Sequence, residues 1–572
     1  MQKSEMGEGK KPDALIVLTP LFSSPEHNVF RIQRENDLEG ARVLHIAGGE
    51  HSGIVINRLA DPFIPVEAEG DVVISYSVWI SDGGSPKQEK RTMTFSLQDG
   101  VVDVDQGKAV IHAFFREFLN HFPKDYMSFV KTLLKQLHGG YTEIASISVE
   151  MRHLRQEELV AIPDAVQYDS SSELEAASSA QVQEVLEHAF PNGLTQETIA
   201  EALRCSLEEA SEFLRELEAQ GIARKVDDEW LRVDTRNVEG MVRSASASGG
   251  ADRPNVAIIS CLFVEKQAVD ALLEDSHTIH KYKSGGDSNV YTVGRIGSHH
   301  VVATKLALIG DSREATTSAG SITTRLLGNF QHIEHVLITG VGGAVPHYTD
   351  AKRHARLGDV VVSTKYIYAH ELMVDRHTET FKEFMTRQYC PTDAMIPQIV
   401  AECGDELLSR WESLTAEAIS RLSSTPEVDF RSPPRNTDVL ALPVGSGNVV
   451  VVPHPDEGQR TSSLAHVGPV GALATMKKKT NGNGMEAEEQ EEETVAQIRE
   501  RFSCQYGVRA IDAGFDSVVA AVVGSRIDSW ALVRGIADYQ HGQSRASKLW
   551  QAHAATRAAA MARAIIERLP KA

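Results

Sequence analysis

The chain has 572 residues, of which 42% are hydrophobic and 24% are charged, and its formal net charge is −21. This length exceeds what one hydrophobic core supports, so we expect several globular domains. The negative charge disfavours a protein dedicated to DNA, because contact with phosphates depends on lysine and arginine. No apolar run is long enough to span a bilayer and no paired-cysteine motif is present, so we expect a soluble cytoplasmic protein without membrane contact, zinc site or disulfide framework.

The first part of the chain, residues 1–155, is predicted to form an α+β domain. Residues 72–80 and 93–97 alternate between apolar and polar side chains on either side of turn residues, which predicts an antiparallel pair of strands. Apolar residues at helical spacing follow over 109–137 and are interrupted at Pro123, so two helices are expected. We assign no activity to this domain, which would recruit a partner or control the rest of the chain.

An acidic, serine-rich segment at 156–180 has the composition of a linker. Residues 181–235 then show three short helical patterns followed by two strand patterns. The third helix is expected to begin at Ser206, whose spacing to Glu209 fits a capping box, and to end at Gly221. This order of elements resembles a winged helix-turn-helix domain.

The third helix of such a domain typically enters the major groove of DNA. Here the helix carries one arginine against five glutamates, namely Glu208, Glu209, Glu212, Glu216 and Glu218. Phosphates would repel this face, so we expect a spacer or a site for a protein partner rather than DNA binding. A transcription regulator is the alternative.

Residues 236–253 have the composition of a flexible linker, and residues 254–572 are predicted to form the largest domain. Apolar strand patterns alternate there with helical stretches, which is typical of an α/β domain with a central, mostly parallel sheet. The strands are expected at 256–260, 300–306, 336–339, 359–363 and 530–533. A lysine- and glutamate-rich insertion at about 477–494 is expected to be disordered.

Ligands of open α/β sheets bind at the carboxyl ends of strands, so the residues after each strand pattern are candidates for a site. Glu265 follows the first of these strands, a glycine cluster follows the third, and Asp538 follows the last. A glycine cluster alone is weak, because it can simply mark a turn. The order of TGVGGAVP, RLGDVVVS, AGFDSVVAAVV and ALVRGIADY, however, resembles the nucleoside phosphorylase/nucleosidase superfamily over nearly all of residues 254–572.

The resemblance implies a role for each position. Asp538 matches the general acid that protonates the leaving purine, and Glu265 matches the glutamate that orients the attacking water in the nucleosidase branch. Phe515-Asp516 stands where the family has methionine and then glutamate, whose carboxylate binds the ribose hydroxyls. The glycine cluster would bring backbone N–H groups to the substrate; it consists of Gly340, Val341, Gly342 and Gly343.

Structural roles are the alternative for each carboxylate alone. Asp538 would then cap the following helix, and Glu265 would be an acid that the helix dipole favours. We interpret the two together, in this order, as an active site.

Phosphorylases of this superfamily hold phosphate with arginines that are absent from the matching positions, where Glu265 and Thr339 stand. A carboxylate repels phosphate, so the sequence favours hydrolysis, with phosphorolysis as the alternative. Lys305, Arg313 and Thr317 lie at or beyond the end of another strand pattern, and a second basic cluster lies at 352–356. Either group would contact the phosphates of a substrate such as AMP or ATP, or be ordinary loop charge.

We therefore expect release of the free base from a purine nucleoside or nucleotide, without a metal or organic cofactor. A domain that kept the fold and lost turnover would instead sense nucleotides, and the aspartate at 516 favours that alternative. The resemblance also implies a homodimer.

Overall fold

The computed structural model describes residues 15–571 except 39–41, 61–69, 81–86, 99, 101–103, 121, 124, 156–157, 160–177, 191, 204, 234–252, 281–289, 307–312, 375–380, 403, 424–427, 445–448, 456–459, 461, 475–494 and 540–547. The insertion expected at about 477–494 and most of both expected linkers therefore lie outside the described residues. No helix in the described part of the chain combines the length and the apolar character that a bilayer crossing requires.

The chain divides into two compact units. The first combines Met1–Ser171 with two later segments, Pro346–His354 and Asn436–Thr461, and the second contains the rest. The two later segments lie within 254–572, so the first unit draws residues from the range that the sequence analysis assigned to the largest domain.

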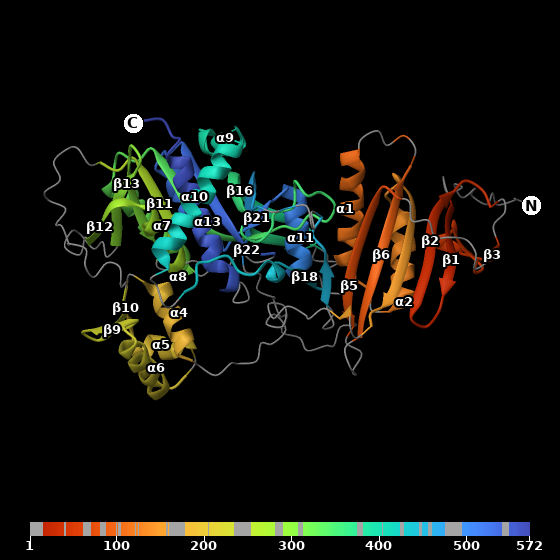
Figure 1. Cartoon of the computed structure of the whole chain (residues 1–572), viewed down its shortest axis with the longest axis horizontal. Helices are drawn as coiled ribbons and strands as arrows, with labels where there is room; N and C mark the ends of the chain where they lie inside the picture. Colours follow the sequence, from red (N-terminus) through yellow and green to blue (C-terminus); the bar gives the residue numbers. More distant parts are fainter. Residues whose placement is uncertain are drawn as a thin grey trace, which may run out of the picture. The chain divides into compact units, whose positions relative to one another are not determined.

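A single nine-stranded sheet forms the first unit, in the order β18-β19-β5-β6-β7-β2-β1-β4-β3 (Figure 1). The antiparallel pair predicted around 72–97 is confirmed as β5 and β6. The strands are β1 Leu15–Ser23, β2 His27–Glu35, β3 Val43–Ile46, β4 Ile54–Asn57, β5 Val72–Ile80, β6 Lys87–Leu97, β7 Ile144–His153, β18 Leu440–Pro443 and β19 Val449–Val452.

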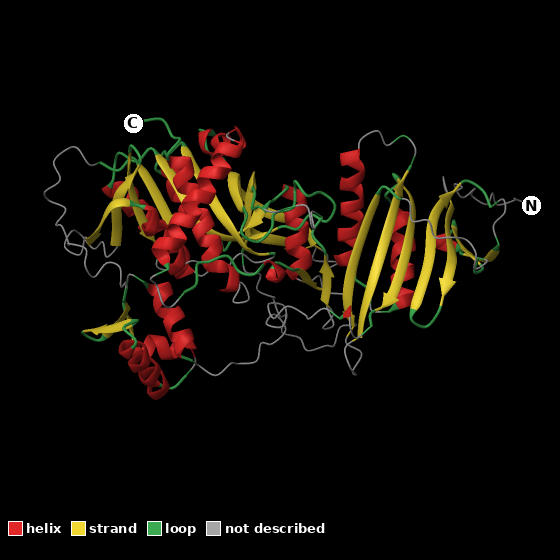
Figure 2. Ribbon diagram, in the orientation of Figure 1, coloured by secondary structure: helices red, strands yellow, loops and turns green. Residues whose placement is uncertain are grey.

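Two helices, α1 (Val104–Asn120) and α2 (Tyr126–Gly139), cover the apolar face of this sheet (Figure 2). The ring centroid of Tyr76 on β5 lies 5.4 Å from that of Phe115 on α1. The ring centroid of Phe30 on β2 lies 6.2 Å from that of Phe129 on α2. The predicted pair of helices, interrupted at Pro123, is thus confirmed, because the helical apolar stripe meets the alternating apolar face of the strands.

The winged helix-like segment of the second unit consists of α4 (Ser179–Ala189), α5 (Gln196–Leu203) and α6 (Leu207–Ala219) with three short strands. The predicted capping box is present: Ser206 Oγ accepts from the N–H of Glu209 at 3.2 Å, and the Ser206 N–H donates to Glu209 Oε2 at 2.9 Å. The helix α4 begins at Ser179, so the end of the expected linker already belongs to it. The strands are β8 Leu194–Thr195, β9 Ala223–Val226 and β10 Glu229–Arg232.

The remainder of the second unit is built on a ten-stranded sheet in the order β12-β13-β14-β11-β15-β21-β20-β16-β17, with β22 between β15 and β16. All five predicted strands are present, several of them longer than expected. The strands are β11 Val256–Ser260, β12 Glu274–His280, β13 Val290–Ile296, β14 His299–Lys305, β15 His335–Ala344, β16 Val360–Val374, β17 Phe381–Tyr389, β20 Ala465–Leu473, β21 Ala510–Ile511 and β22 Ser529–Asp538.

This sheet is mixed rather than mostly parallel as expected. The strand β11 is parallel to β14 and β15, and β15 is parallel to β22. The strands β12, β13 and β14 form an antiparallel meander, and β16 pairs antiparallel with both β17 and β22. Short connections between consecutive strands permit only antiparallel pairing, which explains the meander at the edge.

The helices of this part are α7 Phe263–Leu272, α8 Arg313–Asn329, α9 Met395–Glu402, α10 Gly404–Leu422, α11 Val495–Tyr506, α12 Asp516–Gly524 and α13 Lys548–Ile566. The alanine-rich α13 packs on β22 and β15. Its close approach depends on Gly535 of β22, where a Cβ atom would overlap the backbone carbonyl of Ala554.

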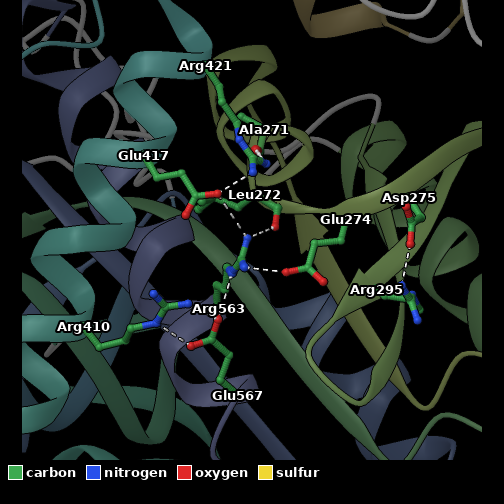
Figure 3. A network of polar contacts seen from close by, with 10 residues as sticks. All are labelled: Ala271, Leu272, Glu274, Asp275, Arg295, Arg410, Glu417, Arg421, Arg563 and Glu567. Carbon is green, nitrogen blue, oxygen red and sulfur yellow. Dashed lines mark hydrogen bonds and ion pairs between the residues drawn. The ribbon is translucent and has the colours of Figure 1, made fainter.

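A network of polar contacts joins α7, α10, β12 and α13 (Figure 3). Arg563 of α13 is 5% exposed and donates to the carbonyl oxygen of Leu272 at 2.7 Å. Its guanidinium also contacts Glu274 at 2.6 Å and Glu567 at 3.0 Å. Arg410 of α10 completes the network by pairing with Glu567 at 2.7 Å. The buried charge of Arg563 is therefore neutralised and hydrogen-bonded on several sides.

We expect Arg563→Met to lower the free energy of unfolding of the second unit by about 3 kcal/mol, because the carboxylates of Glu274, Glu417 and Glu567 and one carbonyl lose their buried partner. The matched control is Arg295→Met, whose ion pair with Asp275 is 50% and 73% exposed. That control should cost less than about 1 kcal/mol. Urea titration of both variants measures the difference, and equal losses would show that the network in Figure 3 adds no stability beyond a surface pair.

Candidate functional site

Glu265 lies in the first turn of α7, directly after β11, and is only 1% exposed. One carboxylate oxygen, Oε2, accepts from the backbone N–H groups of Cys261 and Leu262, both at 2.8 Å. The other oxygen, Oε1, accepts from the N–H of Val341 on β15, also at 2.8 Å. The carboxylate therefore connects the residues that follow β11 to the neighbouring parallel strand β15.

Burial raises the pKa of Glu265 above its ordinary value. The positive charge of Arg534 and the three backbone N–H donors oppose this shift, because they favour the ionised carboxylate. Burial is the larger influence, so this carboxyl group releases its proton at a higher pH than an exposed glutamate does.

Arg534 is a fully buried arginine in the middle of β22. Its Nη2 lies 3.2 Å from Oδ2 of Asp512, and its guanidinium carbon lies 4.2 Å from the ring centroid of Phe515. None of its three side-chain nitrogens makes a hydrogen bond with the residues that the structure describes. A buried guanidinium is costly unless acceptors surround it, so this position calls for a hydrogen-bond acceptor from a ligand or solvent.

Asp512 and Tyr366 hold the segment between β21 and α12. The hydroxyl of Tyr366 accepts from the N–H of Phe515 at 2.7 Å and donates to Oδ1 of Asp512 at 3.4 Å. The Asp512 side chain is completely buried, and burial raises its pKa while Arg534 opposes the shift. The segment therefore presents one carboxylate to Arg534 and keeps Phe515 stacked on the guanidinium.

The glycine cluster continues β15 and forms no turn, contrary to its expected place after the strand. A Cβ on Gly340 would overlap the carboxylate of Glu265 and lie 2.8 Å from Nη1 of Arg534. A Cβ on Gly342 would lie 3.2 Å from the Cβ of Arg534. The missing side chains thus leave the room that Glu265 and Arg534 occupy, which is why small residues stand here.

We expect Gly340→Ala to lower kcat of the base release expected from the sequence by about 10- to 100-fold, because it displaces a carboxylate by a distance that matters for catalysis. The control is Gly328→Ala on α8, where an added Cβ would meet nothing within 4 Å. Steady-state kinetics of both variants measure the effect. A Gly340→Ala variant with the rate of the wild type would mean that the position of Glu265 is unimportant.

Asp538 is the last residue of β22 and is half-buried. Its Cα pairs with that of Gly343 on β15, across a register shift between Gly342 and Gly343. Val341, which holds Glu265, lies two residues earlier on the same strand, a separation of about 7 Å. Both predicted catalytic carboxylates therefore stand at the carboxyl end of β15.

Asp516, the predicted sugar contact, is 8% exposed at the start of α12. Its Oδ2 accepts from Arg387 Nη1 at 2.8 Å, and its Oδ1 accepts from the hydroxyl of Tyr389 at 3.0 Å. Both partners belong to β17. A sugar hydroxyl would have to share this carboxylate with two protein donors.

The predicted phosphate contacts do not form one group. Lys305 is 3% exposed, and burial lowers its pKa to about 8. Its ammonium group donates to three backbone carbonyls. Lys305 is therefore neither a phosphate ligand nor a solvated loop charge. Arg313 begins α8, with its side chain outside the described residues, and Thr317 is exposed on the same helix. In the second cluster His354 is buried and its Nε2 lies 2.8 Å from Nδ1 of His454.

Arg534, Asp512 and Tyr366 were not identified from the sequence. The signal for Arg534 was its charge within the apolar run WALVRGIA, since a charged residue in a buried strand needs a partner or a function. Within the described residues, His, Cys, Asp and Glu side chains nowhere gather in a group of three or more that would hold a metal ion.

Comparison with known families identifies one part of the chain. Residues 168–234 match the model of a family described as a winged helix-turn-helix domain. This segment is similar to that family, in agreement with the winged helix-turn-helix resemblance given in the sequence analysis. The match begins at residue 168, within the expected linker.

Among solved structures, similarity extends over 55% of the chain. A 5′-methylthioadenosine/S-adenosylhomocysteine nucleosidase from Neisseria meningitidis, in complex with methylthio-immucillin-A, aligns with 99% of its length at 15% identity and a TM-score of 0.32. Futalosine hydrolase of Helicobacter pylori aligns with 98% of its length at 12% identity and a TM-score of 0.31.

One curated protein is similar in sequence, a nucleotide-binding leucine-rich repeat (NLR)-like protein of Hyaloscypha variabilis. It is 31% identical over 109 residues, which are 19% of this chain. The chain spans about a tenth of the length of that relative, since the match covers 10% of it.

Proposed function

We propose that the second unit hydrolyses the N-glycosidic bond of a purine nucleoside or nucleotide and releases the free base. The observation that carries this proposal is the placement of the Glu265 carboxylate, which three backbone N–H groups hold beside Arg534 at the carboxyl end of β15. The Cα of Asp538 pairs with that of Gly343, two residues beyond Val341 on β15, and this proximity supports the proposal that an acid and a base act on one substrate.

In the proposed reaction Glu265 and Arg534 would bind the attacking water between a proton acceptor and a cation. The carboxylate of Glu265 would take a proton from the water while the water oxygen forms a bond to the sugar carbon. Asp538 would give a proton to the departing purine. Positioned general acids and bases each accelerate such steps by about 10²- to 10⁴-fold. Asp512 would keep the guanidinium of Arg534 in place through their 3.2 Å ion pair.

Phosphorolysis is the second candidate. The buried guanidinium of Arg534 favours it, because its nitrogens make no hydrogen bond to the described residues and arginine binds phosphate oxygens well. Against it stand two carboxylates, since Asp512 contacts this guanidinium and Glu265 lies beside it. Their charges compensate the single cation and would repel a phosphate dianion. Hydrolysis therefore fits the charge balance of the site better.

The decisive experiment incubates the full chain with adenosine, AMP, ATP or methylthioadenosine and measures free base, with and without inorganic phosphate. Hydrolysis predicts base release that is independent of phosphate and yields the free sugar. A requirement for phosphate and formation of a sugar 1-phosphate would identify a phosphorylase. Binding of a nucleotide without any base release would identify a sensing module.

A further inference from the structure

The winged helix contacts the part of the chain around Glu265 at two anchor residues, and the first of them is Lys305. Lys305 ends β14, and its Nζ donates to the carbonyl oxygens of His188 at 3.3 Å, Phe190 at 3.0 Å and Leu306 at 2.9 Å. The first two carbonyls belong to the end of α4. A lysine ammonium has three donors and a helix C-terminus attracts positive charge, so Lys305 caps α4 with two of its donors and binds Leu306 with the third.

Phe263, the first residue of α7, is the second anchor. The ring of Phe190 meets it edge-on at a centroid distance of 5.4 Å. The guanidinium carbon of Arg232 on β10 lies 4.7 Å from the centroid of Phe263. Arg232 is in turn paired with Glu187 of α4 at 3.2 Å, and its side chain is 2% exposed. Two elements of the winged helix therefore hold one aromatic ring of α7.

Both anchors lead directly to Glu265. Phe263 stands two residues before it in the same helical turn. On the other side, Ser260 of β11 pairs with Lys305, and the N–H of Leu306 donates to the carbonyl of Ser260 at 2.8 Å. The next two residues after Ser260 supply the N–H groups that bind Oε2 of Glu265.

We propose that the docked winged helix is a positioning element of the hydrolase, and that Phe190 and Lys305 act by holding the turn 260–265. This inference rests on the proposed function, because it assigns the winged helix to the regulation of that same site. The winged helix would then act within its own chain, and any partner that pulls it away would slow the reaction.

The test compares Phe190→Ala and Lys305→Met in the full chain with Val226→Ala, an exposed position in the wing that is 43% accessible. For both anchor variants we expect kcat for base release to fall about tenfold while KM changes little, because the water is misplaced but the purine still binds. Hydrogen exchange should show lost protection of the amides in 260–266. The control should match the wild type in both measurements.

An unchanged or increased kcat in both anchor variants would overturn the proposal, even where exchange shows that the turn has loosened. Unchanged exchange in both would overturn it as well. If Phe190→Ala fails to fold, Phe190→Leu and Lys305→Met decide the question. A wild-type chain that releases no base would refute the proposed hydrolase separately, and the exchange measurement alone would then show whether the winged helix orders this turn.

Discussion

Replacing Asp538 by asparagine should lower the rate of purine release by about 10²- to 10⁴-fold, because an amide cannot give a proton to the leaving base. Asparagine has nearly the shape of aspartate, and the side chain is half-buried, so the free energy of unfolding should change by less than about 1 kcal/mol. Steady-state assays of free base measure the loss, and thermal unfolding checks the fold.

A substrate with a good leaving group separates the role of this acid from a structural one. A nitrophenyl riboside departs as a stable anion and needs no protonation, so the Asp538→Asn variant should cleave it at close to the rate of the wild type. A variant that keeps more than about a tenth of the wild-type rate with adenosine would contradict the role of general acid.

The second large effect is expected for Glu265→Gln, which keeps the shape of the side chain and removes the proton acceptor. We expect kcat to fall by about 10²- to 10³-fold with both purine and nitrophenyl substrates, since water must be activated in either case. This pattern differs from that of Asp538→Asn. Loss with the purine substrate alone would contradict the assignment of Glu265 to the water.

The pH dependence of folding stability tests the environment of Glu265 without a measurement of reaction rates. Because burial raises the pKa of Glu265 above 4.5 in the folded state, folding favours its protonated form. Its contribution to stability is fully present below the ordinary value of 4.5 and is lost as the pH rises through the raised pKa. The stability of Glu265→Gln relative to the wild type should therefore increase over that interval, as measured by urea unfolding at several pH values.

Local patterns predicted the elements that local interactions determine. The capping box of Ser206 and Glu209 is a contact between residues three apart, so the sequence states it directly. The strand at 256–260 was predicted with its observed bounds, because a short run of buried residues lies between a proline and a helix start. The pairing of β19 with β5 could not be predicted, since Val449 and Trp79 lie far apart in the chain and neither residue marks the other.

For the candidate site, the sequence likewise predicted the positions of two carboxylates along the chain but not the contacts between distant elements. Strand order and motif placed Glu265 and Asp538 after strands. Glu265 does follow β11, in the first turn of α7, whereas Asp538 is the last residue of β22, which is longer than expected. The proposed role of Arg534 depends on Asp512, Phe515 and Glu265, which come from other elements, and only the folded chain brings them together. The glycines were expected after the strand rather than within β15 for the same reason, because the side chains that need their space are distant in sequence.

The hairpin of β18 and β19 affects how the chain can be made and divided. The sheet of the first unit lacks its outermost pair of strands until the ribosome has passed residue 452, well into the second half of the chain. Until then the edge of β5 that faces away from β6 lacks β19 at residues 77–79, and its backbone groups can pair with another nascent polypeptide. Any truncated gene product that stops before residue 440 carries that unprotected edge permanently, so a fragment cut at the end of the first 171 residues is a poor substitute for the unit itself.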